Sequence, residues 1–116
     1  MTQEAVIELD AIREAAHSAC ALMKVLSNPD RLLLLCELSL GERSVGELQD
    51  ELGILQPTLS QQLAVLRDAE LVSTRREGKS IHYRIASEPA LAVMQVLYAQ
   101  FCHTGRGSGR NRTRRS

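Results

Sequence analysis

The fold is indicated most directly by residues 56–72, which read QPTLSQQLAVLRDAELV. Proline is favoured at the first position of a helix, so Pro57 predicts a helix over roughly residues 57–69. Leucines at spacings of four and three form one apolar face, which should bind this helix to the core: Leu59, Leu63 and Leu66. The opposite face carries small, uncharged side chains: Thr58, Gln61 and Ala64, with Ser60 and Val65 at its edges.

A second short helix precedes this one. Ser44 and Glu47 have the spacing of a capping box, which predicts a helix over about residues 45–52, and Gly53 marks its end. Two short helices joined by a tight turn that contains glycine suggest a helix-turn-helix. The outer face of the 57–69 helix suits the DNA major groove, because glutamine, serine and threonine can hydrogen-bond base edges or phosphates.

A basic β-hairpin follows the helix pair. Residues 71–86, LVSTRREGKSIHYRIA, read as two extended segments around EGKS, where Gly78 can supply the turn. The second segment alternates apolar and polar residues, the period of a half-buried strand, in the order Ile81, His82, Tyr83, Arg84 and Ile85. His82 is expected to point outward into solvent or toward phosphate. We interpret the hairpin as a wing beside the helix pair.

Eight side chains are candidates for DNA contacts. Arg75, Arg76 and Lys79 of the hairpin are the main electrostatic candidates, expected at phosphates or in a minor groove. The full set is Thr58, Ser60, Gln61, Gln62, Arg67, Arg75, Arg76 and Lys79. Two alternatives stay open, because helix-turn-helix geometry has uses other than DNA binding. The 57–69 helix can be a solvated amphipathic helix, or the winged helix can serve protein contacts alone.

Three more helices complete the expected fold, which is mostly α with a small β-hairpin. An apolar stripe at spacings of three and four predicts a first helix over about residues 4–26. Asn28 can cap a second helix, which begins at Pro29, is apolar nearly all round and ends at Gly41. Pro89 starts a last helix over about residues 89–103.

The chain resembles the ArsR/SmtB family of bacterial winged helix-turn-helix repressors in four collinear segments: LSNPDRLLLLCEL, RSVGELQDEL, QPTLSQQLAVLRDAELV and REGKSIHYRI. The resemblance covers about residues 12–103. It implies a homodimer through the first and last helices, and a helix-turn-helix and wing that bind double-stranded operator DNA until an inducer releases it. Gln62 departs from the pattern, since many family members carry histidine there.

The cysteines suggest which inducer the chain senses. Metal-sensing members of the family often place cysteines in a box that matches residues 42–48, ERSVGEL, where this chain has Ser44 and Gly46. The last helix lacks the Asp/His array of a second family metal site. Cys36 and Cys102 instead match the positions of a thiol- and persulfide-sensing subgroup, which includes sulfide-responsive and biofilm or virulence regulators. This likeness implies that an oxidant or reactive sulfur species links Cys36 to Cys102 and thereby modulates DNA binding.

Other interpretations of the cysteines remain open. Both can be inert core residues, in which case the protein binds DNA without a thiol inducer. A metal-responsive repressor is a second alternative, with a zinc site formed by His17, Cys20, Cys102 and His103. In the thiol scheme Cys102 is expected to react first, because Cys36 lies among leucines and His103 follows Cys102. Cys102 is also expected to continue the inward stripe of the last helix.

Composition limits the remaining possibilities. A length of 116 residues suits one domain, expected over residues 1–105. Residues 106–116 hold five arginines and no acid and are expected to form a disordered tail, which leaves nine basic and fourteen acidic residues elsewhere. Without a signal-like or membrane-spanning stretch, the expected location is the cytoplasm. No Cys-x-x-Cys, Ser/His/Asp or cofactor-loop pattern stands out, so neither an enzyme nor a cofactor is expected.

Overall fold

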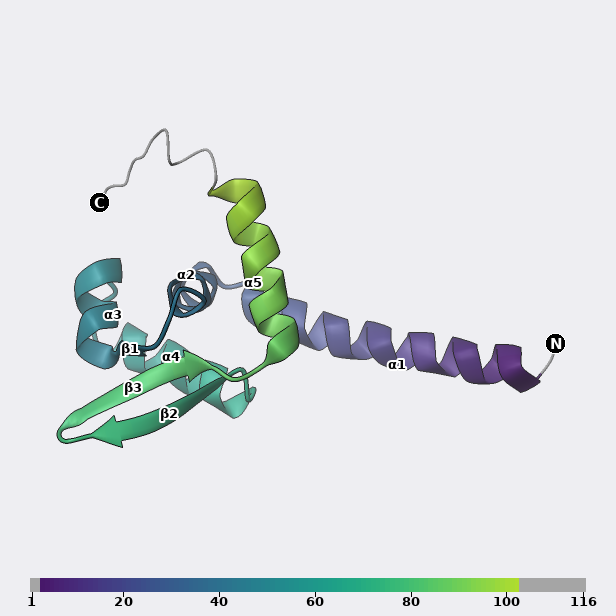
Figure 1. Ribbon diagram of the computed structural model, residues 1–116, viewed down its shortest axis with the longest axis horizontal. Coiled ribbons are helices and arrows are strands. Elements are labelled where there is room, and N and C mark those ends of the chain that lie inside the picture. Colours follow the sequence, from purple (N-terminus) through teal and green to yellow (C-terminus); the bar gives the residue numbers. More distant parts are fainter. Residues whose placement is uncertain (1–2, 103–116) are drawn as a thin grey trace.

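The computed structural model describes residues 3–102 as five helices and a three-stranded antiparallel sheet (Figure 1). The elements in chain order are α1 (Gln3–Leu26), α2 (Pro29–Leu38), β1 (Arg43–Ser44), α3 (Val45–Leu52), α4 (Thr58–Asp68), β2 (Val72–Glu77), β3 (Ser80–Ile85) and α5 (Glu88–Phe101). The predicted fold class is confirmed, and each expected helix lies within a few residues of its expected bounds. His103 and the expected tail at 106–116 lie outside the described residues.

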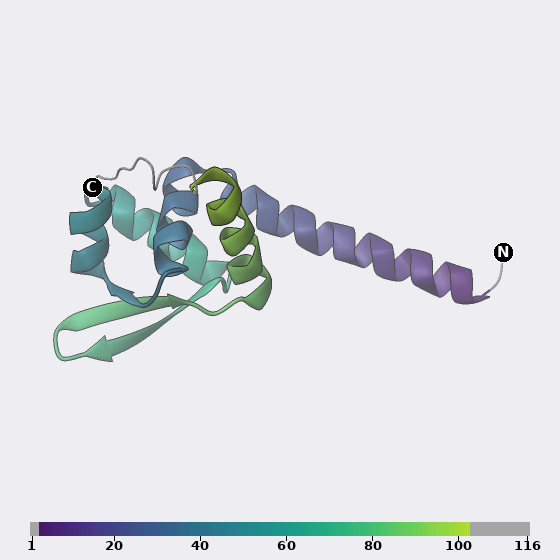
Figure 2. The same ribbon diagram turned by 45° about the horizontal axis from the view of Figure 1, so that its top comes forward.

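Helix α1 projects from the body of the molecule as an arm (Figures 1 and 2). Its 24 residues correspond to a length of about 36 Å, and every residue from Gln3 to Ala21 is exposed. Only the last turns of the helix approach the core, where Leu26 is buried. The apolar stripe that predicted this helix therefore has no partner over most of its length within residues 3–102.

Helix α2 lies in the middle of the body and packs against α1, α3, α4, α5 and β3. Leu34 and Leu35 of this helix are completely buried. They pack in one core with fully buried residues of α3, α4 and α5: Leu48, Leu59, Leu66, Ala90 and Met94. The predicted central position of α2 is confirmed, although its apolar surface is not fully covered, since Leu33 is 43% exposed.

Local signals in the sequence fix the helix ends. The Asn28 side chain accepts a hydrogen bond from the backbone N–H of Arg31 at the start of α2. Ser44 and Glu47 form the predicted capping box of α3. Gly53 ends α3 in the left-handed conformation with φ 69°, where a Cβ atom would be unfavourable. Helix α2 ends at Leu38, earlier than Gly41 had suggested, through backbone bonds from Ser39.

The wing is the antiparallel pair β2–β3, and β1 adds a third strand beside β3. Thr74 of β2 and Arg43 of β1 both pair with Tyr83 of β3, and Gly78 makes the hairpin turn. Strand β1 was not predicted, because two residues are too short to show a strand period. Its pairing holds the start of α3 against the wing. None of the helices in residues 3–102 combines the length and apolar character needed to cross a bilayer.

Candidate DNA interface and cysteine pair

Helix α4 presents its polar face to solvent. Leu59, Leu63 and Leu66 are buried at 2% exposure or less, and the face opposite them is exposed at Thr58, Ser60, Gln61 and Ala64. Among these, the hydroxyl of Ser60 donates to the side-chain oxygen of Gln56. Arg67, near the end of the helix, is also exposed. The exposed face of α4 thus carries small or polar, uncharged side chains over its first two turns. Such a face can approach base edges closely.

Gln62 differs from its neighbours on α4. It is half-buried, and its side-chain oxygen accepts a hydrogen bond of 3.1 Å from Nη1 of Arg31. Nε of the same arginine donates to the carbonyl oxygen of Val25 at 2.7 Å. Sequence reasoning placed Gln62 among the DNA contacts but missed Arg31, which lies 31 positions earlier on α2. No periodic pattern links two positions so far apart.

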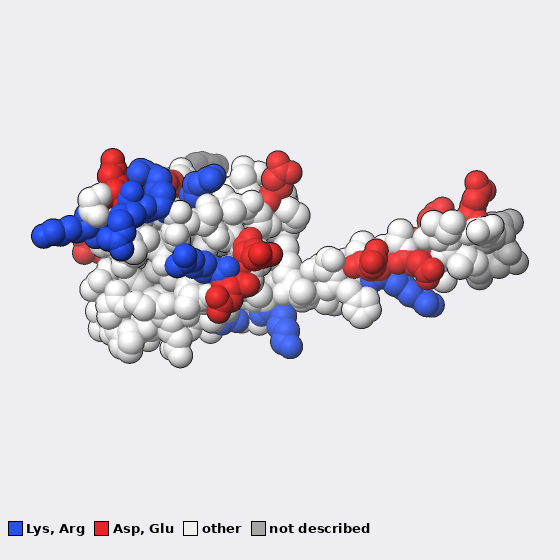
Figure 3. Space-filling model, turned by 90° about the horizontal axis from the view of Figure 1, so that it is seen from below, with Lys and Arg blue, Asp and Glu red and all other residues white. Residues whose placement is uncertain are grey.

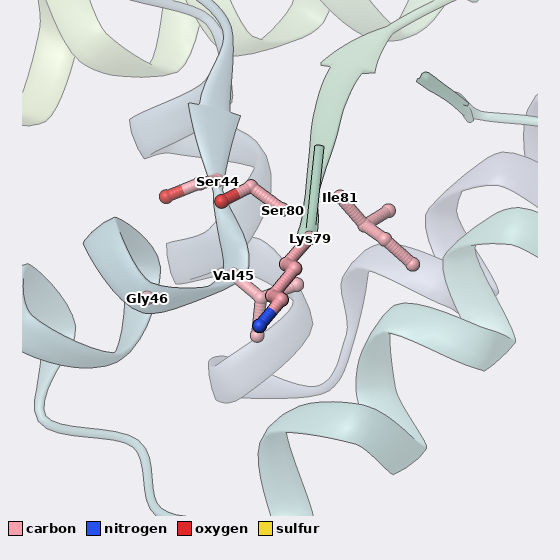
Figure 4. A pocket seen from close by; sticks show the side chains of 6 residues that line it. All are labelled: Ser44, Val45, Gly46, Lys79, Ser80 and Ile81. Atoms are coloured by element: carbon pink, nitrogen blue, oxygen red, sulfur yellow. The ribbon is translucent and has the colours of Figure 1, made fainter. Parts of the chain in front are cut away.

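The wing adds two exposed basic groups to the candidate interface. Arg76 and Lys79 are exposed near the hairpin turn, and Lys and Arg side chains gather at the end of the molecule that lies opposite α1 (Figure 3). A hollow of about 320 Å³ lies beside them and is lined by Ser44, Val45, Gly46, Lys79, Ser80 and Ile81 (Figure 4). Two hydroxyls and one ammonium are its polar side-chain groups, so it offers hydrogen bonds and positive charge to an anion.

Arg75, the third wing cation, is already paired. Its Nε lies 2.9 Å and its Nη2 2.8 Å from the two carboxylate oxygens of Glu42, and Nη1 lies 3.4 Å from Glu77. Hydrogen bonds from Arg75 lower the pKa of Glu42, and the same bonds raise the pKa of Arg75. Sequence reasoning proposed Arg75 for phosphate contact, but in this structure its guanidinium is neutralised by two carboxylates.

The His82 side chain on the wing is less exposed than expected. It is only 19% exposed, and its Nε2 lies 3.6 Å from a carboxylate oxygen of Glu77. The prediction that His82 faces solvent is therefore wrong. The His82 position lies between Ser44 of β1 and Arg75 of β2 in the sheet, and the Glu77 carboxylate lies beside its imidazole.

Cys36 lies where α2 meets α5. Its Sγ is 3.9 Å from Sδ of Met94, a residue with no exposed surface, and the thiol itself is half-buried. Burial raises the pKa of the Cys36 thiol, and the charges of Cys102 and Glu37 raise it further. Cys36 therefore packs against α5, the helix that ends at Cys102, although 66 positions separate the two cysteines in the sequence.

Cys102 caps the C-terminal end of α5 and is exposed. It does not continue the inward stripe as expected, because α5 ends at Phe101 and Tyr98, one turn earlier, is itself 43% exposed. Cys102 is thus accessible to a reagent in solution, whereas Cys36 is shielded. Cys20 lies on α1, exposed beside His17. The three cysteines are all free thiols.

The alternative zinc site is not assembled in the described part of the chain. Residues 3–102 contain no group of three or more His, Cys, Asp or Glu side chains placed to hold a metal ion. Of the four ligands considered, His103 lies outside the described residues. His17 and Cys20 lie on the arm at positions exposed to solvent.

A groove of about 680 Å³ runs between the last part of α1, the end of α4 and the start of α5. It is lined by Ala15, Ser18, Ala19, Ala21, Leu22, Val25, Ala69, Leu71, Ser87, Pro89 and Val93. Large apolar side chains are exposed further along both helices: Val6, Ile7, Leu9, Ile12 and Met23 on α1, and Val96, Tyr98 and Phe101 on α5. Exposed apolar surface on this scale is typical of a contact with another protein chain.

Comparisons with known proteins agree with this geometry. The family pattern described as "Bacterial regulatory protein, arsR family" matches residues 28–74. The chain is 52% identical to the biofilm growth-associated repressor of Agrobacterium fabrum (strain C58 / ATCC 33970), over 83% of this chain and 82% of the relative.

Two solved structures show the same fold. The crystal structure of the transcriptional repressor BigR from Xylella fastidiosa is similar with a TM-score of 0.75 and 46% identity, covering 88% of this chain and 98% of that one. The homodimeric winged helix-turn-helix DNA-binding domain Mb0332 from Mycobacterium bovis, solved by NMR, is similar with a TM-score of 0.60 and 27% identity, covering 93% and 94%.

Proposed function

The chain belongs to the ArsR family of bacterial transcriptional regulators. We propose that it is a homodimeric repressor whose affinity for operator DNA changes when Cys36 and Cys102 become linked. The observation that carries the proposal is the placement of Cys36 at the contact between α2 and α5, the helix that ends at Cys102. We place its action in the cytoplasm, where thiols are kept reduced until a signal arrives.

The dimer is supported by the apolar surfaces of α1 and α5. Ile7 and Ile12 on the arm are 60% and 57% exposed, and Phe101 on α5 is 75% exposed. An arm of this kind gains stability when a second copy covers it, because each buried apolar side chain contributes about 1.5–3 kcal/mol. The solved Mycobacterium bovis relative is described as homodimeric. A two-fold dimer would present its two α4 helices to successive major grooves, about 34 Å apart.

DNA recognition is assigned to α4 and the wing. Thr58, Ser60 and Gln61 are exposed on α4 and would face base edges, with Gln62 at the border of that face. Arg67, Arg76 and Lys79 are exposed and would contact phosphates. Arg75 is reassigned from phosphate contact to holding the wing against the loop that carries Glu42.

The thiol chemistry proceeds in two balanced steps. The Cys102 thiolate attacks the outer sulfur of a low-molecular-weight persulfide, so Cys102 becomes a persulfide and the carrier leaves as a thiol. The Cys36 thiolate then attacks the inner sulfur of that persulfide, so a Cys36–Cys102 disulfide forms and hydrogen sulfide leaves. A longer bridge forms if Cys102 first acquires a second sulfur from another persulfide. The carrier persulfide is the oxidant in both cases.

The Cys36–Cys102 bond would affect DNA binding through the packing of α2 against α4. Cys36 lies on α2, and the buried residues Leu34 and Leu35 of that helix pack in the same core as Leu59 and Leu63 of α4. A covalent bond from α2 to the end of α5 therefore ties the core beneath α4 to a helix of the proposed dimer interface. Because packed cores deform little, a shift of α2 would change the spacing or mobility of the two α4 helices.

Fluorescence anisotropy with labelled duplex DNA tests the proposal. Duplexes are first selected from a random-sequence library with reduced protein, and affinity is then measured with and without polysulfide. The proposal expects a clear affinity change for the wild type and for Cys20→Ser, the matched control, and none for Cys36→Ser or Cys102→Ser. Affinity that responds equally in all four proteins would refute the assigned thiol pair, and failure to select any duplex would refute DNA recognition.

A further inference from the structure

Arg31 joins three elements of the body. It lies in the first turn of α2, where its backbone N–H donates to the Asn28 side chain at 3.1 Å. Its Nε donates to the carbonyl oxygen of Val25 at 2.7 Å, and its Nη1 donates to Oε1 of Gln62 at 3.1 Å. Val25 lies in the last turn of α1, where carbonyl groups lack an intrahelical partner, so the bond from Arg31 satisfies one of them.

The contact fixes which end of the Gln62 amide faces inward. A guanidinium has only donors, so Gln62 must turn its oxygen toward Arg31. The NH₂ group of the amide, with two donors, is then directed away from Arg31, and no hydrogen bond from it is present within residues 3–102. Gln62 lies one turn after Thr58 and directly after Gln61, both exposed on the outer face of α4. The free donor end therefore borders the face assigned to base edges.

We infer that Arg31 is a positioning residue for base recognition, which locks Gln62 as a hydrogen-bond donor toward the major groove. The inference rests on the proposed DNA-binding function and deepens it. An unrestrained glutamine can pair with adenine by donating to N7 and accepting from N6. With its oxygen engaged by Arg31, Gln62 favours bases that offer acceptors, namely guanine O6 and N7, adenine N7 or thymine O4. Cytosine offers only its N4 amine donor there and is disfavoured.

Arg31 also binds the end of α1, the helix proposed to form the dimer. The orientation of the Gln62 NH₂ group therefore depends on the position of α1. Every base contact by Gln62 then depends on a chain of two hydrogen bonds, from Val25 through Arg31 to Gln62. Arg31 would not touch DNA itself. Its role is separate from the cysteine pair, which lies at the α2–α5 contact.

Selection of duplexes from a random library, followed by sequencing, tests the inference. Four proteins are compared in reduced form: wild type, Gln62→Glu, Arg31→Met and the control Gln61→Glu. The wild type is expected to exclude cytosine at one position of each half-site. Gln62→Glu keeps the Arg31 contact as an ion pair but turns the outer end into an acceptor. It should therefore prefer cytosine at that same position, by about tenfold or more.

The other variants separate base recognition from a merely structural role. Arg31→Met frees the amide to rotate and should relax the preference at the Gln62 position while leaving other positions of the site unchanged. Gln61→Glu adds the same charge without an Arg31 partner, so its changes should fall at a different position. Circular dichroism of each variant verifies folding before selection.

Three results would overturn the inference and leave the proposed function intact. A uniform loss of affinity in Arg31→Met, with the base preference intact, would make Arg31 a purely structural residue. A uniform loss in Gln62→Glu would place its donor on a phosphate. If the wild type selects a clear consensus but no position responds to Gln62, the amide reads no base. If the wild type selects no consensus, both the proposed DNA-binding function and this inference fail.

Discussion

The carboxylate of Glu42 holds the guanidinium of Arg75 through two oxygens, at 2.9 Å from Nε and 2.8 Å from Nη2. The two residues are 33 positions apart and connect the loop before β1 to the middle of β2. The Arg75 side chain is 50% exposed, yet its charge is matched by Glu42 and Glu77. The wing therefore presents fewer free cations than its sequence suggests.

Arg75→Gln and Arg76→Gln should change the salt dependence of DNA affinity to different extents. Each phosphate contact steepens the fall of log affinity with log salt by about 0.9. Arg76→Gln should therefore lower the slope by about 1 per protomer, because Arg76 is exposed and has no acidic partner among the described residues. Arg75→Gln should leave the slope nearly unchanged. Anisotropy titrations over a range of salt concentrations measure both, and equal slope changes would show that DNA displaces Glu42 from Arg75.

The Cys36 thiol should react slowly near neutral pH and faster as the pH rises. Burial, then the charges of Cys102 and Glu37, raise its pKa, so near neutral pH it stays protonated and its attack is slow. In Cys20→Ser/Cys102→Ser, which keeps the burial of Cys36 and the charge of Glu37, alkylation of Cys36 should accelerate as pH rises above the usual thiol range. Glu37→Gln removes one of the causes and should move this acceleration to lower pH. A Cys36 that alkylates fully at neutral pH in the folded protein would contradict the assigned environment.

A charged side chain introduced on α1 tests whether this helix forms the dimer interface. Ile12 is 57% exposed on α1, and Ile12→Glu should convert the dimer to a monomer, because a carboxylate cannot be buried there without a partner. Leu55→Glu is the matched control, since Leu55 is 69% exposed in the turn between α3 and α4, away from the arm. Sedimentation velocity distinguishes the two masses. A dimer that survives Ile12→Glu would exclude this part of α1 from the interface.

The core around α2 should dominate stability. Leu34 has no exposed surface and packs with α4, so Leu34→Ala should cost about 2–5 kcal/mol in the free energy of unfolding. Leu55→Ala, at an exposed site, should cost less than about 0.5 kcal/mol. Urea unfolding at one fixed protein concentration compares the two, because the stability of a dimer depends on concentration. Similar midpoints for both variants would contradict the observed core.

Much of the fold could be predicted because its signals are local. The capping box of Ser44 and Glu47, the cap at Asn28 and the leucine face of α4 each lie within a few consecutive residues, and all three were found from spacing alone. The turn at Gly78 is a further local signal, since its positive φ favours glycine.

The details of the candidate site depend on contacts between distant residues. Glu42 with Arg75 and Arg31 with Gln62 join positions more than 30 apart, and both change the role expected of a predicted DNA contact. Strand β1 is too short to show a strand period, yet it places Ser44 opposite His82 in the sheet. The pairing of Cys36 with Cys102 was implied by resemblance rather than by spacing, and only the packing of α5 on α2 brings Cys36 to the helix that ends at Cys102.

Peptide mapping by mass spectrometry, after exposure of the reduced dimer to polysulfide, shows whether Cys36 and Cys102 become linked. The account predicts one cross-linked species that joins the peptides of Cys36 and Cys102, as a disulfide or with added sulfur atoms, while Cys20 stays outside the link. Mixing dimers of Cys36→Ser and Cys102→Ser chains shows whether the link forms within a chain or across the dimer. Modification confined to Cys20, or separate adducts on Cys36 and Cys102 that never join, would contradict the account.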